Sequence, residues 1–131
     1  MSILGRRVPS TAIAGFALLM VLLALLPAVS ATPPREIRLV VKGMAFYLKN
    51  DLETPNPTLK VKAGERVRVI VENQERGITH DFAVPRLGAA LDPLQWSESG
   101  TVTINIPRRP GAYEYVCRPH QLMMRGAIQV G

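Results

Sequence analysis

The chain has 131 residues, among them one Cys, two His and five Met, and its formal net charge is +6 at neutral pH. This length predicts one domain, with room for a short additional segment. A single Cys excludes an intramolecular disulfide, an iron–sulfur cluster and a cysteine-rich zinc site, and two His exclude a three-histidine zinc site. The composition therefore limits a metal centre to one thiolate and two imidazoles.

The first thirty-one residues have the pattern of a secretory signal peptide. Arg6 and Arg7 precede an uncharged apolar run over residues 12–26, and Pro27 and small residues follow it up to Ala31. This order is typical of a Sec-type signal, so we predict cleavage after Ala31 and a periplasmic or secreted protein. Fifteen apolar residues are fewer than the ~20 that span a bilayer, and an uncleaved membrane anchor is the alternative.

Residues 32–131 are the predicted folded domain. Because Arg6 and Arg7 lie upstream, this part holds fourteen Lys and Arg against ten Asp and Glu, a net charge of +4. The two signs are interspersed, and no basic run indicates a nucleic-acid partner. Without a disulfide, one hydrophobic core has to stabilise the domain.

The domain is predicted to consist of short strands separated by turns. Alternating or β-branched segments indicate strands at residues 36–41, 44–47, 58–62, 66–71, 79–84, 100–106, 112–117 and 126–130. The polar segment 49–57 is expected to be a loop, and residues 87–95 a helical turn or loop. The pattern therefore favours an all-β fold, an antiparallel two-sheet sandwich or barrel.

The same alternation predicts which side chains are buried. In the first strand Ile37, Leu39 and Val41 are expected to face the core, with Val40 facing outward. Tyr113, Tyr115 and Cys117 fall on one face of a later strand. Trp96 is expected in the core with these Tyr residues.

The metal-binding side chains are concentrated after the strand at 112–117. Cys117, His120, Met123 and Met124 lie within eight residues, and His80 lies in another extended segment. A trigonal His₂Cys site with a long axial bond to Met is the arrangement of electron-transferring blue copper centres. The residue types therefore indicate one copper ion.

Two stretches resemble the cupredoxin family of small copper proteins. PGAYEYVCRPHQLMMRGAIQVG, residues 110–131, is similar to the C-terminal copper loop of plastocyanins, pseudoazurins and amicyanins. LKVKAGERVRVIVEN, residues 59–73, followed by THDF at 79–82, resembles the segment that carries the family's first His ligand. The resemblance implies a Greek-key β-sandwich with one type 1 copper ion at one end. It implies His80, Cys117 and His120 as the equatorial ligands.

The axial ligand is open between two residues. Amicyanin-like loops place Met three residues after the His, which selects Met123, and azurin-like loops place it four after, which selects Met124. The ending Met-Arg-Gly also matches Met124. We favour Met124 and expect Met123 to face outward beside His120.

Two positions depart from the family pattern. The family usually has Asn directly after the first His, hydrogen-bonded to the residue that follows the Cys, whereas this chain has Asp81 and Arg118 there. We predict that these two side chains form a charge-assisted pair that ties the two ligand segments together.

The predicted function is that of an exported carrier of single electrons between redox partners. A partner is expected to dock near His120, on an apolar ring of Pro85, Leu87, Ala89, Pro119 and Leu122. The net charge of +4 suggests an acidic rim on that partner. We expect a monomer that contacts a membrane only if the N-terminal segment is retained.

Two other functions are open to this set of residues. A periplasmic copper chaperone or storage protein without a redox role is the alternative, and the neighbouring Met123 and Met124 favour it. A nucleophilic Cys117–His120 pair would make the chain an enzyme, but no orienting third residue or oxyanion hole can be identified, so we predict no enzymatic activity.

Overall fold

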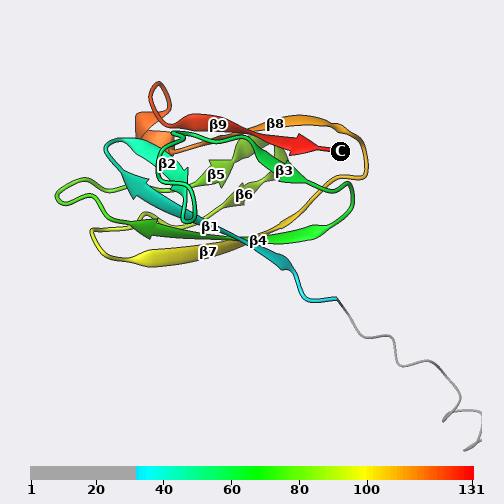
Figure 1. The fold of residues 1–131 in the computed structure, drawn as a ribbon, viewed down its shortest axis with the longest axis horizontal. Coiled ribbons are helices and arrows are strands. Elements are labelled where there is room, and N and C mark those ends of the chain that lie inside the picture. Colours follow the sequence, from blue (N-terminus) through cyan, green and yellow to red (C-terminus); the bar gives the residue numbers. More distant parts are fainter. Residues whose placement is uncertain (1–31) are drawn as a thin grey trace, which may run out of the picture. The chain divides into compact units, whose positions relative to one another are not determined.

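Two packed sheets make up the part of the chain that the computed structural model describes, residues 32–131 (Figure 1). The four-stranded sheet has the order β2-β1-β4-β7, with β1 (Arg35–Lys42), β2 (Ala45–Leu48), β4 (Arg66–Asn73) and β7 (Ser99–Asn105). The five-stranded sheet has the order β3-β9-β8-β5-β6, with β3 (Leu59–Val61), β5 (Ala83–Val84), β6 (Ala89–Ala90), β8 (Gly111–Val116) and β9 (Arg125–Val130). The predicted all-β two-sheet fold is confirmed.

The strand pairing is mixed, and the expected purely antiparallel arrangement is wrong. β1 and β4 are parallel, with Ile37 opposite Val69, and β3 and β9 are parallel, with Leu59 opposite Ile128. The other pairs of neighbouring strands are antiparallel. The chain crosses to the second sheet at β3 and returns at β4, which brings β4 beside β1 in the same direction. Such crossings depend on the tertiary fold, so strand patterns do not reveal them.

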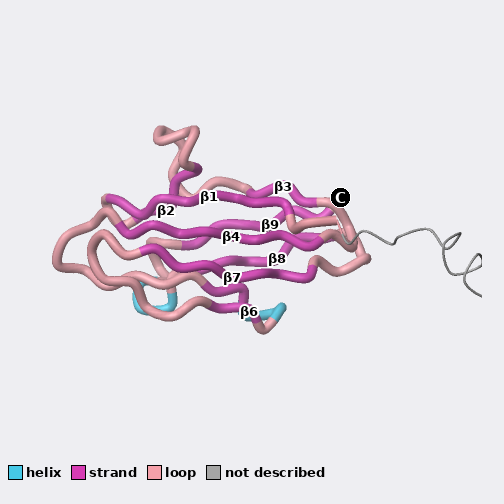
Figure 2. Tube along the Cα trace, turned by 90° about the horizontal axis from the view of Figure 1, so that it is seen from below, coloured by secondary structure: helices cyan, strands magenta, loops and turns pink. Residues whose placement is uncertain are grey.

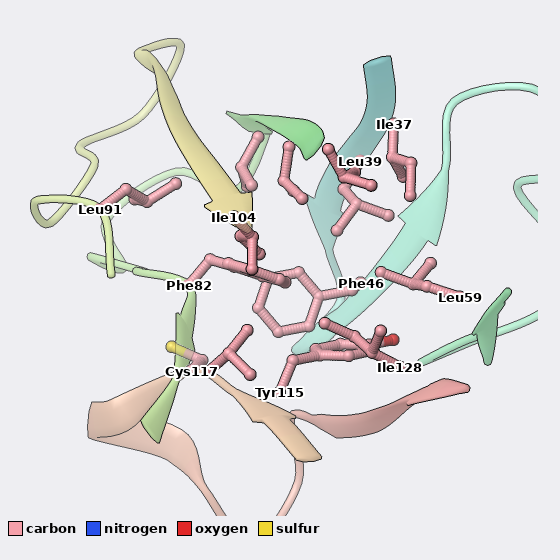
Figure 3. Close-up of a cluster of buried hydrophobic side chains, with 14 of the residues drawn as sticks. Ile37, Leu39, Phe46, Leu59, Phe82, Leu91, Ile104, Tyr115, Cys117 and Ile128 are labelled. Carbon is pink, nitrogen blue, oxygen red and sulfur yellow. The ribbon is translucent and has the colours of Figure 1, made fainter. Parts of the chain in front are cut away.

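The core lies between the sheets and follows the alternation of the strands. In β4 the side chains of Val67, Val69 and Val71 are buried, while Arg66 and Arg68 are exposed. Figure 3 shows part of this cluster of buried side chains. Three aromatic rings lie at its centre: the Phe46 ring meets the Phe82 and Tyr115 rings edge-on, and the last two are stacked. This packing ends at Cys117, whose buried side chain belongs to the same cluster.

Two expectations about burial need correction. Val40 is buried, because its cross-strand neighbours Tyr47 and Glu72 flank it on the outer face of the sheet. Trp96 is 46% exposed and its ring lies under the Arg76 guanidinium, 4.1 Å from the ring centre. This cation–π contact covers one face of the indole outside the core.

The region between β4 and β7 also differs from the expected strand and loop. Of residues 79–84, Ala83–Val84 form a strand, and His80 makes an isolated bridge to Leu94. The following residues form a 3₁₀ turn, η1 (Pro85–Leu87), and then β6, which pairs back onto β5. Gly88 makes this hairpin possible, because its φ of 62° is in the left-handed region that glycine adopts easily.

The predicted signal segment, residues 1–31, lies outside the residues that the structure describes. Residues 33–131 form one compact unit. None of the helices within 32–131 has the length and apolar composition needed to cross a membrane.

Candidate metal centre

Three metal-binding side chains from distant parts of the chain meet where β8 ends, at the left end of the sandwich in Figure 1. Cys117 directly follows β8, and His120 closes the 3₁₀ turn η2 (Arg118–His120). His80 lies between β4 and β5. The Cys117 Sγ atom is 3.7 Å from Nδ1 of His80 and 3.5 Å from Nδ1 of His120. The structure thus brings together the three residues that the sequence selected as equatorial ligands.

The spacing of these donor atoms fits a single metal ion. Metal bonds of about 2.0–2.1 Å to nitrogen and about 2.3 Å to sulfur, at trigonal to tetrahedral angles, separate the two donors by about 3.5–3.8 Å. Both measured sulfur–nitrogen distances lie in this range. One thiol and two imidazoles are a donor set suited to copper, because sulfur favours Cu(I) and imidazole accommodates Cu(II).

Backbone and amide hydrogen bonds fix the position of His80. Its amide N–H donates to the Leu94 carbonyl, and its carbonyl accepts from the Leu94 N–H at 2.7 Å. The buried Asn73 side chain donates to the carbonyls of Ile78 and Leu94, each at 2.9 Å. These bonds close the loop after β4 and leave the His80 ring no exposed surface.

The loop after β8 is held by its own backbone. The His120 N–H donates to the Cys117 carbonyl, and the Met124 N–H donates to the His120 carbonyl. The Cys117 N–H in turn donates to the Met124 carbonyl at 2.9 Å. Residues 117–124 therefore turn back on themselves and present Cys117 and His120 on the same side.

Burial sets the protonation of the donors. Desolvation raises the pKa of the Cys117 thiol, and it lowers the pKa of the His80 imidazole. Without a metal, the thiol therefore stays protonated and His80 stays neutral at pH 7. A metal ion that binds here has to displace the thiol proton, whereas the His80 nitrogen needs no deprotonation.

Glu75 completes the surroundings of His80, and the sequence analysis missed it. Its Oε2 lies 2.9 Å from Nε2 of His80. A carboxylate on one ring nitrogen fixes the tautomer and leaves the other nitrogen, here Nδ1, for a metal. The available signal was an acidic residue in the short loop between Asn73 and His80.

The predicted pair of Asp81 and Arg118 is confirmed. The Asp81 carboxylate accepts the Arg118 backbone N–H at 2.7 Å and the Arg118 Nε–H at 2.6 Å. Asp81 is 3% exposed. Its own N–H donates to the Cys117 sulfur at 3.5 Å. One residue therefore connects the His80 segment with both Cys117 and the residue that follows it.

The two candidate axial residues have opposite environments. Met124 has no exposed surface and packs in the core cluster, whereas Met123 is 61% exposed. The Asn56 side chain of the β2–β3 loop donates to the Met123 carbonyl at 3.1 Å. The main chain is thus anchored at the point where Met123 turns outward and Met124 turns inward.

The expected apolar ring around His120 is only partly formed. Pro119, Leu122 and Met123 are exposed on the same loop as His120. Pro85, Leu87 and Ala89 lie farther along the sandwich. The chain runs from Ala83, which pairs with Val116 near the end of β8, back along β8, so that Arg86 lies over the Tyr113 ring. Figure 2 shows the two helical turns, η1 and η2, at separate places along the molecule.

Comparisons with known proteins agree with this fold. A family model described as the cupredoxin-like domain matches residues 15–130. No curated protein sequence matches the chain.

Solved structures of copper proteins have the same fold. Auracyanin B is 25% identical with a TM-score of 0.60, over 79% of this chain and 93% of that protein. Auracyanin A, a "blue" copper protein of the green thermophilic photosynthetic bacterium Chloroflexus aurantiacus, is 20% identical with a TM-score of 0.59. The match covers 76% of this chain and 100% of that protein. A third structure is the metal-binding domain of the Cu(I)-exporting P-type ATPase CopA of Streptococcus pneumoniae D39, solved with Cu(I). It is 14% identical with a TM-score of 0.56, and the match covers 78% of this chain and 91% of that one.

Proposed function

The chain belongs to the cupredoxin-like domain family, and we propose that it is an exported carrier of single electrons that uses one type 1 copper ion. The observation that carries this proposal is the pair of sulfur–nitrogen distances, 3.7 and 3.5 Å, between Cys117 and the Nδ1 atoms of His80 and His120. These three residues are the proposed equatorial ligands. Met124 is the proposed axial ligand, because it is the buried one of the two candidates.

The chain's contribution to electron transfer is a donor set that is already in place. A bound copper ion would supply the one-electron couple between Cu(II) and Cu(I). Cys117 and His80 are fully buried, so water has little access to two of the donors. Their hydrogen bonds to Asp81 and Glu75 limit movement of the sulfur and the imidazole. A site that hardly rearranges between two charge states requires little reorganisation for each transfer.

The partly exposed ring of His120 is the proposed contact with a redox partner. Leu122 is 93% exposed and Met123 is 61% exposed on the same loop. An apolar surface of this kind suits a small and brief interface, as electron-transfer encounters require. The net charge of +4 of residues 32–131 would suit an acidic rim on that partner.

Copper delivery or storage without a redox role is the second candidate. The exposed Met123 favours it, because a thioether at the surface could receive or release Cu(I). The fold does not distinguish the two roles, since it occurs both in a blue copper protein and in a domain of a Cu(I) exporter.

The test is the visible spectrum of the protein with copper. Every core residue described here lies between Ile37 and Val130, so the segment 32–131 contains the complete sandwich and can be expressed alone. With Cu(II), an electron carrier gives an intense blue band that disappears in Cys117→Ser, and chemical reduction and reoxidation are reversible. A protein that stays colourless and keeps Cu(I) tightly through reoxidation refutes the proposal in favour of delivery or storage.

A further inference from the structure

We propose that Arg118 and Asp81 form a charge-balanced pair in which each charge offsets the effect of the other on the reduction potential of the metal centre. The inference rests on the proposed function, because it concerns a copper ion held by His80, Cys117 and His120. It assigns to Arg118 the role of a positioning residue that acts on the site through Asp81.

The Asp81 carboxylate belongs to the immediate surroundings of the proposed ligands. Asp81 directly follows His80, is 3% exposed, and donates its N–H to the Cys117 sulfur. Its negative charge therefore lies beside two proposed ligands, in surroundings that screen charges far less than water. A negative charge at this place favours Cu(II), the more positive state, and so lowers the reduction potential.

The Arg118 guanidinium supplies the compensating positive charge. The Arg118 Nε–H donates to Asp81 Oδ2 at 2.6 Å, and its backbone N–H donates to Oδ1 at 2.7 Å. A further guanidinium contact, 3.4 Å long, reaches the Leu91 carbonyl and anchors the far end of the side chain. The carboxylate is thus held on both oxygens by one residue.

Together, the two opposite charges have nearly the same effect on the reduction potential as two neutral side chains would. Arg118 favours Cu(I) through its positive charge and offsets the effect of Asp81 on Cu(II). The pair is asymmetric in burial, since the Arg118 side chain is 49% exposed and Asp81 is 3% exposed. Because the two charges offset each other, removing one of them would leave the electric field of the other uncompensated at the copper ion.

The test is a cycle of Asp81→Asn, Arg118→Gln and the double variant in copper-loaded protein. Asp81→Asn keeps an oxygen acceptor for the Arg118 backbone N–H, and Arg118→Gln keeps an amide donor. Asp81→Asn is expected to raise the reduction potential, and Arg118→Gln to lower it. Each single change is expected to alter the ratio of Cu(I) to Cu(II) affinity by about tenfold or more, the size expected for an uncompensated charge several ångströms away. The double variant is expected to return close to the wild type.

A matched control is Arg35→Gln, which removes the same charge from an ion pair elsewhere in the domain, that of Arg35 and Glu65, where the Arg side chain is 48% exposed. Arg35 lies far from the metal centre. It pairs with Val67 at one end of the β1–β4 pair, whereas the loop that carries His80 follows Asn73 at the other end. This variant is expected to leave the potential unchanged. Thermal unfolding of the metal-free variants shows separately how much the pair stabilises the fold.

The outcomes separate this inference from the proposed function. A wild type that forms no blue copper complex refutes the proposed function before any variant is compared. If the wild type is blue but both single variants keep its reduction potential, the inference is overturned and the proposed function stands. The same holds if both variants shift the potential in the same direction. Lower melting temperatures with unchanged potentials would show that the pair is purely structural, which also overturns it.

Discussion

A single oxygen of Glu75 connects His80 with the turn between β1 and β2. Its Oε2 lies 2.9 Å from Nε2 of His80 and accepts the backbone N–H of Met44 at 3.0 Å. Met44 has a φ of 59°, in the left-handed region that is uncommon for a residue other than glycine. The carboxylate thus holds an unfavourable turn in place and at the same time directs Nδ1 of His80 toward Cys117.

We predict that Glu75→Gln weakens copper binding by about tenfold or more, because loss of a carboxylate partner lowers the basicity and the order of a ligating imidazole. Competition with a chelator of known copper affinity measures the change. Glu98→Gln is the control, since it removes an exposed carboxylate from a neighbouring loop. Equal affinities of Glu75→Gln and the wild type would contradict a role of Glu75 in positioning His80.

Replacement of each methionine by leucine is predicted to identify the axial ligand. Met124→Leu keeps the volume of a buried side chain, costs less than about 1.5 kcal/mol of stability, and is expected to change both the visible spectrum and the reduction potential. Met123→Leu alters an exposed side chain and is expected to leave both unchanged. The reverse result would assign the axial position to Met123.

Asn56→Asp is predicted to loosen the loop that carries Met123 and Met124. The Asn56 amide donates to the Met123 carbonyl, and its oxygen accepts the Phe46 N–H. Aspartate keeps the shape and the acceptor but loses the donor, so a net hydrogen bond of about 0.5–1.5 kcal/mol is lost. Chemical denaturation measures this loss. Faster amide hydrogen exchange in residues 121–124 is expected as well, and unchanged exchange would show that Asn56 does not anchor the loop.

Gly126→Ala is predicted to destabilise the domain by about 1–3 kcal/mol or more, as overpacking of a core does. A methyl group at Gly126 would lie 2.6 Å from Cε1 of Tyr115. The Tyr115 ring has no room to move, because its hydroxyl donates to the Pro57 carbonyl at 2.7 Å and its faces pack in the core. Gly131→Ala, which meets nothing within 4 Å, is the control and should unfold like the wild type in a thermal melt.

The stability of the metal-free protein is predicted to fall as the pH drops below about 6.5. Burial lowers the pKa of His80 below its ordinary value of 6.5, so the unfolded chain binds a proton there before the folded protein does. Stability from neutral His80 is therefore fully present above 6.5 and is lost toward lower pH. Urea unfolding between pH 7.5 and 5.5 measures this slope. His80→Gln should flatten it, and an equal slope in that variant would assign the effect to other groups.

The strands and the types of ligand can be predicted from the sequence, because both depend on which residues are neighbours along the chain. The β-branched alternation of β4 and the spacing of Cys117 and His120 are properties of neighbouring residues. The candidate partnership of Asp81 and Arg118 could be predicted as well, because a resemblance to the cupredoxins aligned two segments that are far apart in the chain. The choice of His80 rests on the same alignment.

Other features depend on contacts that no short pattern contains. Trp96 is apolar and its pattern predicts a place in the core, but it is 46% exposed and the Arg76 guanidinium lies over its ring. Glu75 and Asn56 are ordinary loop residues in the sequence. They reach the site because the folds of their loops place a carboxylate at His80 and an amide at the Met123 carbonyl.

The sequence by itself determined that the chain is an all-β domain with one thiol, two imidazoles and adjacent methionines available to a metal. Only the tertiary structure decided how these groups are arranged: Cys117 lies between two Nδ1 atoms, Met124 is buried and Met123 is exposed. The physical reason is that alternation and spacing are set along the chain. The distances between ligands, and the hydrogen bonds that orient them, are set by packing two sheets and their loops together.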